Sequence, residues 1–426
     1  MKLNYRRTFF IGLAFMSICA FWQLYDGIIP LILDNTFGIG ETMTGVIMAI
    51  DNVLALFLLP IFGTFSDKTN TRLGKRTPYI LFGTIGAVSL MMLLPMAANN
   101  RNFVLFFFSL GFLLIAMGTY RSPAVALMPD LTPKPLRSKA NAVINLMGAL
   151  GGVYALAMIS LTVGEDGNYT LVFATVACLM IVSVFILLLT VKEKKIAETM
   201  PVACEEPVEE GAKGAEGNSK SKLSKPVRRS LIFLFSSVFL WFTAYNAVTT
   251  AYSRYVQNVW GKSGGSFANS ALIGTIAAVL SYIPVGFLSS ALGRKKVILG
   301  GVALMTLAYG ISATFHSYTW MMSLMLICIG IGWAAINVNS YPMVVEMGRG
   351  SDIGKYTGLY YLFSMMAQTL TPILSGALIE KISYRILFPY AAVFSILAFV
   401  MMLFVRHGDS KPSKKTTIIE NFDTPD

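Results

Sequence analysis

The hydrophobic residues of this chain fall into long runs that are separated by short polar segments. A helix that crosses the hydrocarbon core of a bilayer needs about 20 mostly apolar residues. We predict twelve such helices, at residues 8–33, 42–66, 77–97, 102–128, 138–163, 168–191, 229–256, 267–291, 296–316, 319–345, 355–379 and 384–405. The first run is too long for the apolar part of a signal peptide and contains Asp26, so we interpret it as a membrane span.

The distribution of charge predicts how these spans are oriented. If the spans alternate, most of the 34 Lys and Arg residues fall in the segments on the side of the N-terminus. Loops that face the cytoplasm carry such an excess. We therefore expect an integral, multi-pass protein of the cell membrane with both termini in the cytoplasm. The same bias explains the net charge of +12 without a nucleic-acid partner.

Composition excludes a soluble protein. Hydrophobic residues make up 55% of the chain and charged residues 13%, whereas a soluble domain carries about 25% charged residues. One long polar stretch, acidic and then basic with Gly, Ser and Pro between, is typical of a flexible linker. The predicted organisation is an N-terminal six-helix bundle at 1–191, a cytoplasmic linker at 192–228, a C-terminal six-helix bundle at 229–406 and a cytoplasmic tail at 407–426.

The two halves show weak internal likeness. Tyr25-Asp26 in the first span corresponds to Tyr245-Asn246 in the seventh, and an acid follows the fourth and the tenth span. Such repeats are typical of transporters whose binding site lies between the repeats, near the middle of the membrane. We predict an all-α fold of two pseudo-symmetric six-helix bundles.

The loop after the second span carries the most specific pattern. It reads Gly63-Thr-Phe-Ser-Asp67-Lys-Thr-Asn-Thr-Arg-Leu-Gly74-Lys75-Arg76-Thr-Pro-Tyr. This resembles the signature between spans 2 and 3 of the major facilitator superfamily. Its longer form is similar to the glycoside–pentoside–hexuronide cation symporters and to their sucrose-transporter relatives.

A second stretch supports the same resemblance. Residues 123–130, Pro-Ala-Val-Ala-Leu-Met-Pro-Asp, are followed by Arg137-Ser-Lys-Ala-Asn-Ala. The resemblance implies the major facilitator fold and secondary active transport of a sugar or glycoside together with a cation. Melibiose-type members carry paired aspartates where this chain has Ala55 and Leu59, so we expect a proton rather than sodium. Sucrose transporters carry an arginine where this chain has Val125.

Three ionisable residues lie inside predicted spans: Asp26, Asp51 and Arg121. A charge at the centre of a span costs about 2.5–3.5 kcal/mol on insertion scales. We therefore expect these side chains to line a central aqueous cavity and to bind the substrate or the coupling cation. The alternative is a static group that holds helices together.

Aromatic and amide side chains offer groups for a sugar, because rings stack on its apolar faces while amides bind its hydroxyls. The candidates are Trp22, Gln23, Tyr25, Tyr120, Trp241, Tyr245, Asn246, Asn337, Asn339, Tyr341 and Gln368. Trp and Tyr also populate the belts at the membrane interface, which is the competing explanation for the aromatic residues.

The cytoplasmic loops are candidate gates. A carboxylate such as Asp67 can meet a helix N-terminus or an arginine of the facing half in one state and release it in the other. The candidate gating residues are Gly63, Asp67, Gly74, Lys75, Arg76, Asp130, Arg137, Arg294, Glu346 and Lys355, with Asp130 expected to pair with Arg137 and Glu346 with Lys355. The alternative explanation for the basic residues is membrane topology alone.

No catalytic or metal-binding pattern is present in the sequence. It lacks the Gly-rich phosphate loop of ATP-driven proteins and the Cys/His spacing of a zinc site. We predict a protein that is not an enzyme and needs no cofactor besides a coupling cation. We expect its partners to be a small polar solute and the lipid bilayer, and we expect it to work as a monomer. Two alternatives stay open: an exporter or antiporter of apolar compounds, and a membrane receptor or scaffold that retains the fold.

Overall fold

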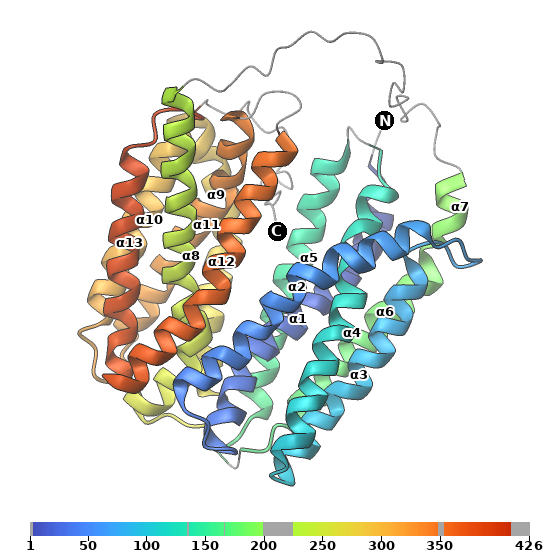
Figure 1. Ribbon diagram of the computed structural model, residues 1–426, viewed down its shortest axis with the longest axis horizontal. Coiled ribbons are helices and arrows are strands. Elements are labelled where there is room, and N and C mark those ends of the chain that lie inside the picture. Colours follow the sequence, from blue (N-terminus) through green and yellow to red (C-terminus); the bar gives the residue numbers. More distant parts are fainter. Residues whose placement is uncertain (1–2, 134–135, 166, 199–224, 348–352, 410–426) are drawn as a thin grey trace.

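The computed structural model is built from helices and describes residues 3–133, 136–165, 167–198, 225–347 and 353–409. Within these residues, twelve helices are long and apolar enough to cross a membrane, as the hydrophobic pattern predicts. Figure 1 shows them arranged in two groups. The first group is α1 (Tyr5–Asn35), α2 (Glu41–Lys68), α3 (Thr77–Asn99), α4 (Phe103–Asp130), α5 (Arg137–Thr162) and α6 (Thr170–Thr190). The second is α8 (Lys225–Trp260), α9 (Ser266–Leu292), α10 (Arg294–Ser312), α11 (Trp320–Met347), α12 (Ile353–Lys381) and α13 (Leu387–Leu403), preceded by the short helix η4 (Tyr384–Ile386).

The two bundles pack with the same internal pattern. In the first bundle α1 packs against α5 and α6, and α4 against α2 and α3. In the second bundle the equivalent helix α8 packs against α12 and α13, and α11 against α9 and α10. The bundles meet chiefly through α2 against α12 and α5 against α9. Since α9 is the second span of its half and α12 the fifth, each second span meets the fifth span of the other half. The interface therefore has pseudo-twofold symmetry.

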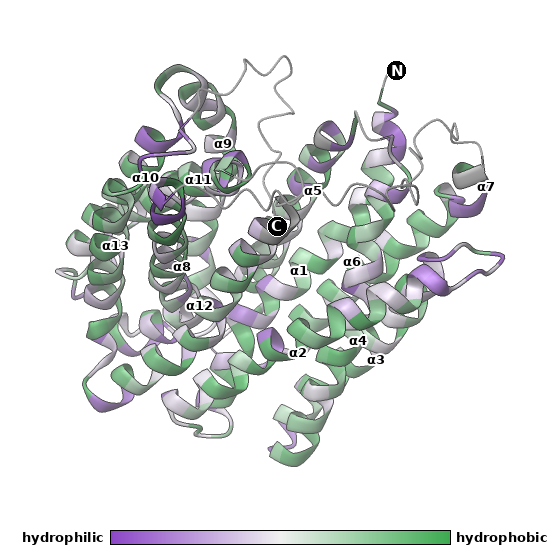
Figure 2. Ribbon diagram, turned by 45° about the horizontal axis from the view of Figure 1, so that its top comes forward, coloured by the Kyte–Doolittle hydropathy of each residue, from purple (hydrophilic) through white to green (hydrophobic). Residues whose placement is uncertain are grey.

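Apolar side chains cover the lateral surface of both bundles. Figure 2 shows hydrophobic residues along the helices and hydrophilic residues near their ends. Phe82, Phe108 and Phe112 are among the large exposed side chains, and an exposed apolar surface of this extent fits contact with lipid. We call the face on which α1 begins and α13 ends the terminal face, and the opposite face the far face (Figure 1).

The predicted linker begins with structure of its own. Residues Glu193–Glu198 form a short helix, α7, and α8 already begins at Lys225. Residues 199–224 lie outside the described part of the chain, as do tail residues 410–426, so the boundaries of linker and tail stay predictions.

Candidate functional site

Two adjoining cavities lie between the bundles. The first has a volume of about 420 Å³ and is walled by α1, α5, α8, α9 and α11. The second has a volume of about 580 Å³ and lies nearer the terminal face, where α4 contributes residues as far as Pro129. Phe15 and Tyr282 line both cavities, so the two spaces adjoin.

One wall of the first cavity is polar and belongs to α1. Trp22, Gln23 and Asp26 all line it, because positions i, i+1 and i+4 fall on neighbouring parts of one helical face. The structure thus brings these three predicted residues together at one cavity.

The opposite wall of the first cavity is aromatic. Tyr245 of α8 and Trp333 of α11 stack with their ring centroids 3.7 Å apart and their planes 2° from parallel. Phe242 meets Trp333 edge-on at 5.2 Å and 86°. Trp333 was not among the predicted residues, since nothing in the local sequence separates it from an interfacial tryptophan.

The second cavity contains Arg121 of α4. Its guanidinium lies over the ring of Trp22, 5.6 Å from the centroid, which joins the polar walls of both cavities. Asn337 and Gln368, two predicted residues from the second bundle, line the same space, together with Asn52 of α2.

Asp51 lies beside this space without being among the residues that line either cavity. Its Oδ1 accepts hydrogen bonds from the backbone N–H of Asn52 at 2.6 Å and from the side-chain amide of Asn52 at 2.7 Å. It interacts electrostatically with Asp26 and with Arg121. All three ionisable residues therefore form one cluster, carried by α1, α2 and α4 of the first bundle.

Three predicted aromatic residues pack inside the bundles instead of lining a cavity. Tyr25 and Trp241 are buried among the helices, and Tyr120 is completely buried, with its hydroxyl donating to the carbonyl of Ala14 at 2.9 Å. In this structure they line neither cavity, and a contact between them and the solute stays a prediction. A long helix at a bundle interface buries more than one face, so a polar ring can serve packing.

Three further candidates also lie away from both cavities. The side-chain amides of Asn246 and Asn339 donate to carbonyls one turn earlier, each at 2.8 Å, and the hydroxyl of Tyr341 lies 3.3 Å from that of Thr357. Each of these side chains therefore forms a hydrogen bond within the second bundle, which a sequence pattern does not reveal.

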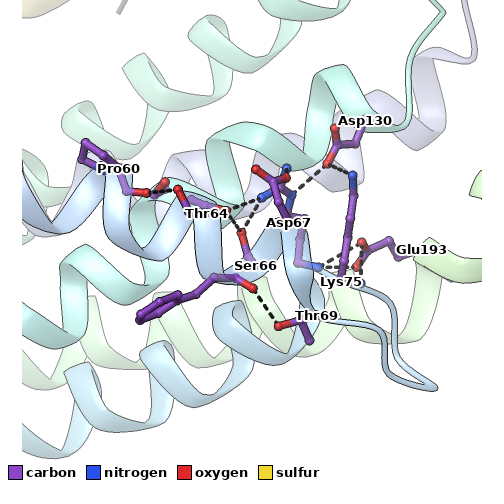
Figure 3. A network of polar contacts seen from close by, with 12 residues as sticks. Pro60, Thr64, Ser66, Asp67, Thr69, Lys75, Asp130 and Glu193 are labelled. Atoms are coloured by element: carbon purple, nitrogen blue, oxygen red, sulfur yellow. Dashed lines mark hydrogen bonds and ion pairs between the residues drawn. The ribbon is translucent and has the colours of Figure 1, made fainter. Parts of the chain in front are cut away.

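Arg76 is the centre of a polar network at the terminal face. Figure 3 shows its partners Asp67 and Asp130 beside Lys75 and Glu193. Arg76 is 5% exposed and forms ion pairs with Asp67 and with Asp130, the latter at 2.8 Å. Its guanidinium also donates to the carbonyl of Gly63 at 3.2 Å, and Lys75 pairs with Asp130 at 3.1 Å. These predicted gating residues therefore meet one another.

The partners in this network differ from the predicted ones. Asp67 pairs with an arginine of its own half rather than of the facing half. Asp130 pairs with Lys75 and Arg76, while Arg137 donates to the carbonyl of Thr132 at 3.2 Å. The tight turn that precedes α3 folds its basic residues back onto α2 and α4.

Glu193 of α7 holds the start of α3, a role that its place in a polar stretch concealed. Its carboxylate accepts the backbone N–H groups of Lys75 at 2.9 Å, Arg76 at 3.0 Å and Thr77 at 2.9 Å, and the hydroxyl of Thr77 at 2.7 Å. The first N–H groups of a helix have no partner within the helix. Gly74 has φ +117°, and a Cβ there would collide with this carboxylate, which explains the glycine.

The second bundle has a similar arrangement. Arg294 at the start of α10 forms an ion pair with Glu346 at the end of α11. Asp409 accepts the backbone N–H of Lys295 at 2.8 Å. Glu346 was predicted to pair with Lys355, whose side chain lies outside the described residues.

At the far face the two bundles touch directly. A Cβ on Gly45 of α2 would collide with the carbonyl of Pro372 of α12, so the two backbones are in contact there. The backbone N–H of Gly265 donates to the carbonyl of Val163 at 2.9 Å, which joins α9 to the end of α5. Both cavities thus lie on the terminal-face side of these contacts.

Comparison with known proteins shows the family. A family model described as MFS/sugar transport protein matches residues 10–386, and the chain belongs to this family. An uncharacterized MFS-type transporter of Mycobacterium tuberculosis is 28% identical over 167 residues, 38% of this chain and 24% of the relative. A sucrose transport protein of Arabidopsis thaliana is 27% identical over 138 residues, 28% of this chain and 23% of the relative. The chain thus matches about a quarter of the length of these curated relatives.

A longer match is with the lactose permease of Lactobacillus helveticus, 21% identical over 347 residues, which are 76% of this chain and 52% of the permease. Among solved structures, nucleoside transporter NupG superposes with a TM-score of 0.67 at 17% identity, covering 95% of this chain and 100% of that one. The POT family transporter PepTSo gives 0.70 at 12% identity, covering 95% and 98%. At such identities these structures establish the major facilitator fold.

Proposed function

We propose that this protein is a secondary active transporter that carries a sugar or glycoside together with a proton by alternating access. The observation that carries the proposal is the pair of cavities between the bundles, with Asp26 facing one and Arg121 facing the other. A carboxylate in a crevice between two rocking bundles is the group that a coupling cation needs. Both cavities are complete within one chain, which supports a monomer as the working unit.

The aromatic and amide groups support a sugar as the solute. Trp333 and Tyr245 offer a stacked aromatic wall, and Gln23 and Gln368 supply amides for hydroxyl groups. The family description and the sucrose and lactose relatives point to the same class of solute.

The excess of Lys and Arg at the terminal face supports a cytoplasmic location for that face in the cell membrane. With the bundles in contact at the far face, the structure then corresponds to an inward-facing state. In the outward-facing state the networks around Arg76 and Arg294 would approach each other across the interface.

A panel of sugars tests the proposal most directly. The purified protein is heated in the presence of each sugar at two pH values, with and without sodium, and a binder is recognised by a raised melting temperature. A hit is then tested for uptake into proteoliposomes under an imposed proton gradient. Uptake that is independent of the gradient would refute proton coupling, and a response to sodium alone would favour the sodium alternative.

An exporter of apolar compounds is the second candidate. The aromatic lining of the first cavity favours it, and an MFS-type efflux transporter of Pyricularia grisea is 25% identical over 122 residues, 29% of this chain and 20% of the relative. In the same assay, stabilisation by apolar compounds and by none of the sugars would support this candidate. A protein that binds a ligand and moves none across the membrane would be the receptor or scaffold.

A further inference from the structure

A buried ion pair joins the two bundles at the far face. Glu41 is the first residue of α2, and its carboxylate pairs with the guanidinium of Arg254 on α8. The hydroxyl of Tyr384, in η4, donates to the other carboxylate oxygen. Glu41 is 6% exposed and Arg254 3%, so the contact is shielded from solvent although it lies near the membrane surface.

We propose that Glu41, Arg254 and Tyr384 form a far-side lock, which holds this face closed and must break before the far face can open. The inference rests on the proposed alternating access, because that cycle requires the far face to open. The ion pairs of Lys75, Arg76 and Arg294 at the terminal face, by contrast, each lie within one bundle.

The lock lies where α2 packs directly against the second bundle. A Cβ on Gly376 of α12 would collide with the backbone carbonyl of Glu41, so α2 and α12 are in contact at the lock itself. One residue further along, the backbone N–H of Thr42 donates to Glu380 of α12 at 2.8 Å. Separation of the bundles at this face therefore has to pull Glu41 away from three elements of the second bundle.

Breaking the ion pair should shift the conformational equilibrium in a definite direction. Removing one partner of a buried pair leaves the other charge buried without compensation. That penalty falls on the closed state, because water reaches both groups once the bundles part. Loss of the Glu41 charge should consequently shift the population toward a far-open state, and reversal of both charges should restore the closed one.

Cys19 provides a reporter, since it lines the first cavity. We would replace Cys178, Cys204 and Cys328 by Ser and label Cys19 with a membrane-impermeant maleimide added from the far side of sealed vesicles. We expect Glu41→Gln to raise the labelling rate about fivefold or more, Tyr384→Phe to raise it less, and Glu41→Arg with Arg254→Glu to return it toward the wild-type rate. Glu165→Gln, which removes an exposed acid from a loop of the same face, is the matched control.

Labelling from the terminal side checks that each variant is folded with its cavity intact. If Glu41→Gln and Tyr384→Phe both label at the wild-type rate, or the charge reversal labels as fast as the single variant, the lock is refuted. The readout needs neither a solute nor uptake, so it can fail while transport stands. It can equally succeed in a protein that carries something other than sugar.

Discussion

Glu193 and Asp409 occupy equivalent places in the two halves of the chain. Each follows the last membrane helix of its half, and each accepts a backbone N–H at the start of the third helix of that half, α3 or α10. Each also lies against a glycine with positive φ, Gly74 or Gly293. In both halves, an acidic residue that follows the last membrane helix thus holds the loop before the third helix in place.

This relationship predicts a loss of stability. In Glu193→Gln the negative charge is lost and one carboxylate oxygen becomes an NH2 group, which cannot accept the backbone N–H groups. Hydrogen bonds to a charged group contribute about 1.5–3 kcal/mol. We expect a clearly lowered melting temperature for the purified variant. Asp409→Asn should have a smaller effect, because the Asp409 side chain is exposed. Glu165→Gln serves as the exposed control, and an unchanged melting temperature for Glu193→Gln would contradict the assignment.

The ionisable cluster predicts how transport is coupled. Asp26→Asn or Asp51→Asn keeps the shape of the side chain and removes the site for a proton. Uphill accumulation in proteoliposomes should fall to equilibration, whereas counterflow, which needs no net proton movement, should continue. If both variants still accumulate solute, the two aspartates have no part in coupling.

The stacked rings of Tyr245 and Trp333 at the first cavity predict that Trp333 contributes to the affinity for a sugar. Aromatic contacts contribute about 0.5–1.5 kcal/mol beyond burial, so Trp333→Ala should weaken sugar binding about threefold to tenfold, measured by calorimetry. Trp333→Phe keeps a ring and should lose less. Trp320 is 75% exposed at the start of α11, and Trp320→Ala is the matched control. Equal losses in the two alanine variants would argue against a specific contact.

The backbone contact between α2 and α12 predicts a steric block. Gly45→Val would force these helices apart at the far face, because the carbonyl of Pro372 occupies the space that the side chain needs. Uptake should fall by at least about tenfold, a loss within the range that a few kcal/mol produces. Gly111→Val is the control, since Gly111 of α4 has open space around the position of a Cβ. Normal uptake by Gly45→Val would show that close contact there is dispensable.

The sequence was sufficient to predict the spans and the fold. Apolar length and the alternation of basic loops are strong signals, and the twelve helices lie within a few residues of the predicted runs. The basic loop was also predictable as a unit, because Asp67 and Arg76 sit in a specific pattern. The partners of Asp67 and Asp130 were not, since several cations compete for each acid at short sequence distance.

The cavity was harder to predict, because a pattern gives a residue type without its direction. Asp26 and Gln23 line the cavity, yet the adjacent Tyr25 points into the bundle. The pairing of Glu41 with Arg254 was not predicted, because charges near the ends of membrane helices are common. Nothing in the local sequence shows which residue of the other half faces them. Contacts between halves depend on tertiary packing, which local periodicity does not encode.

The ionisable residues of the central cluster all belong to the first bundle, while the described cavity-lining residues of the second bundle are uncharged. A potential of 100 mV across the membrane does about 2.3 kcal/mol of work on each elementary charge moved through it. The force that the potential exerts on the central cluster therefore acts on the first bundle. Neutralising Asp26 should therefore change the voltage dependence of the current recorded from an oriented bilayer.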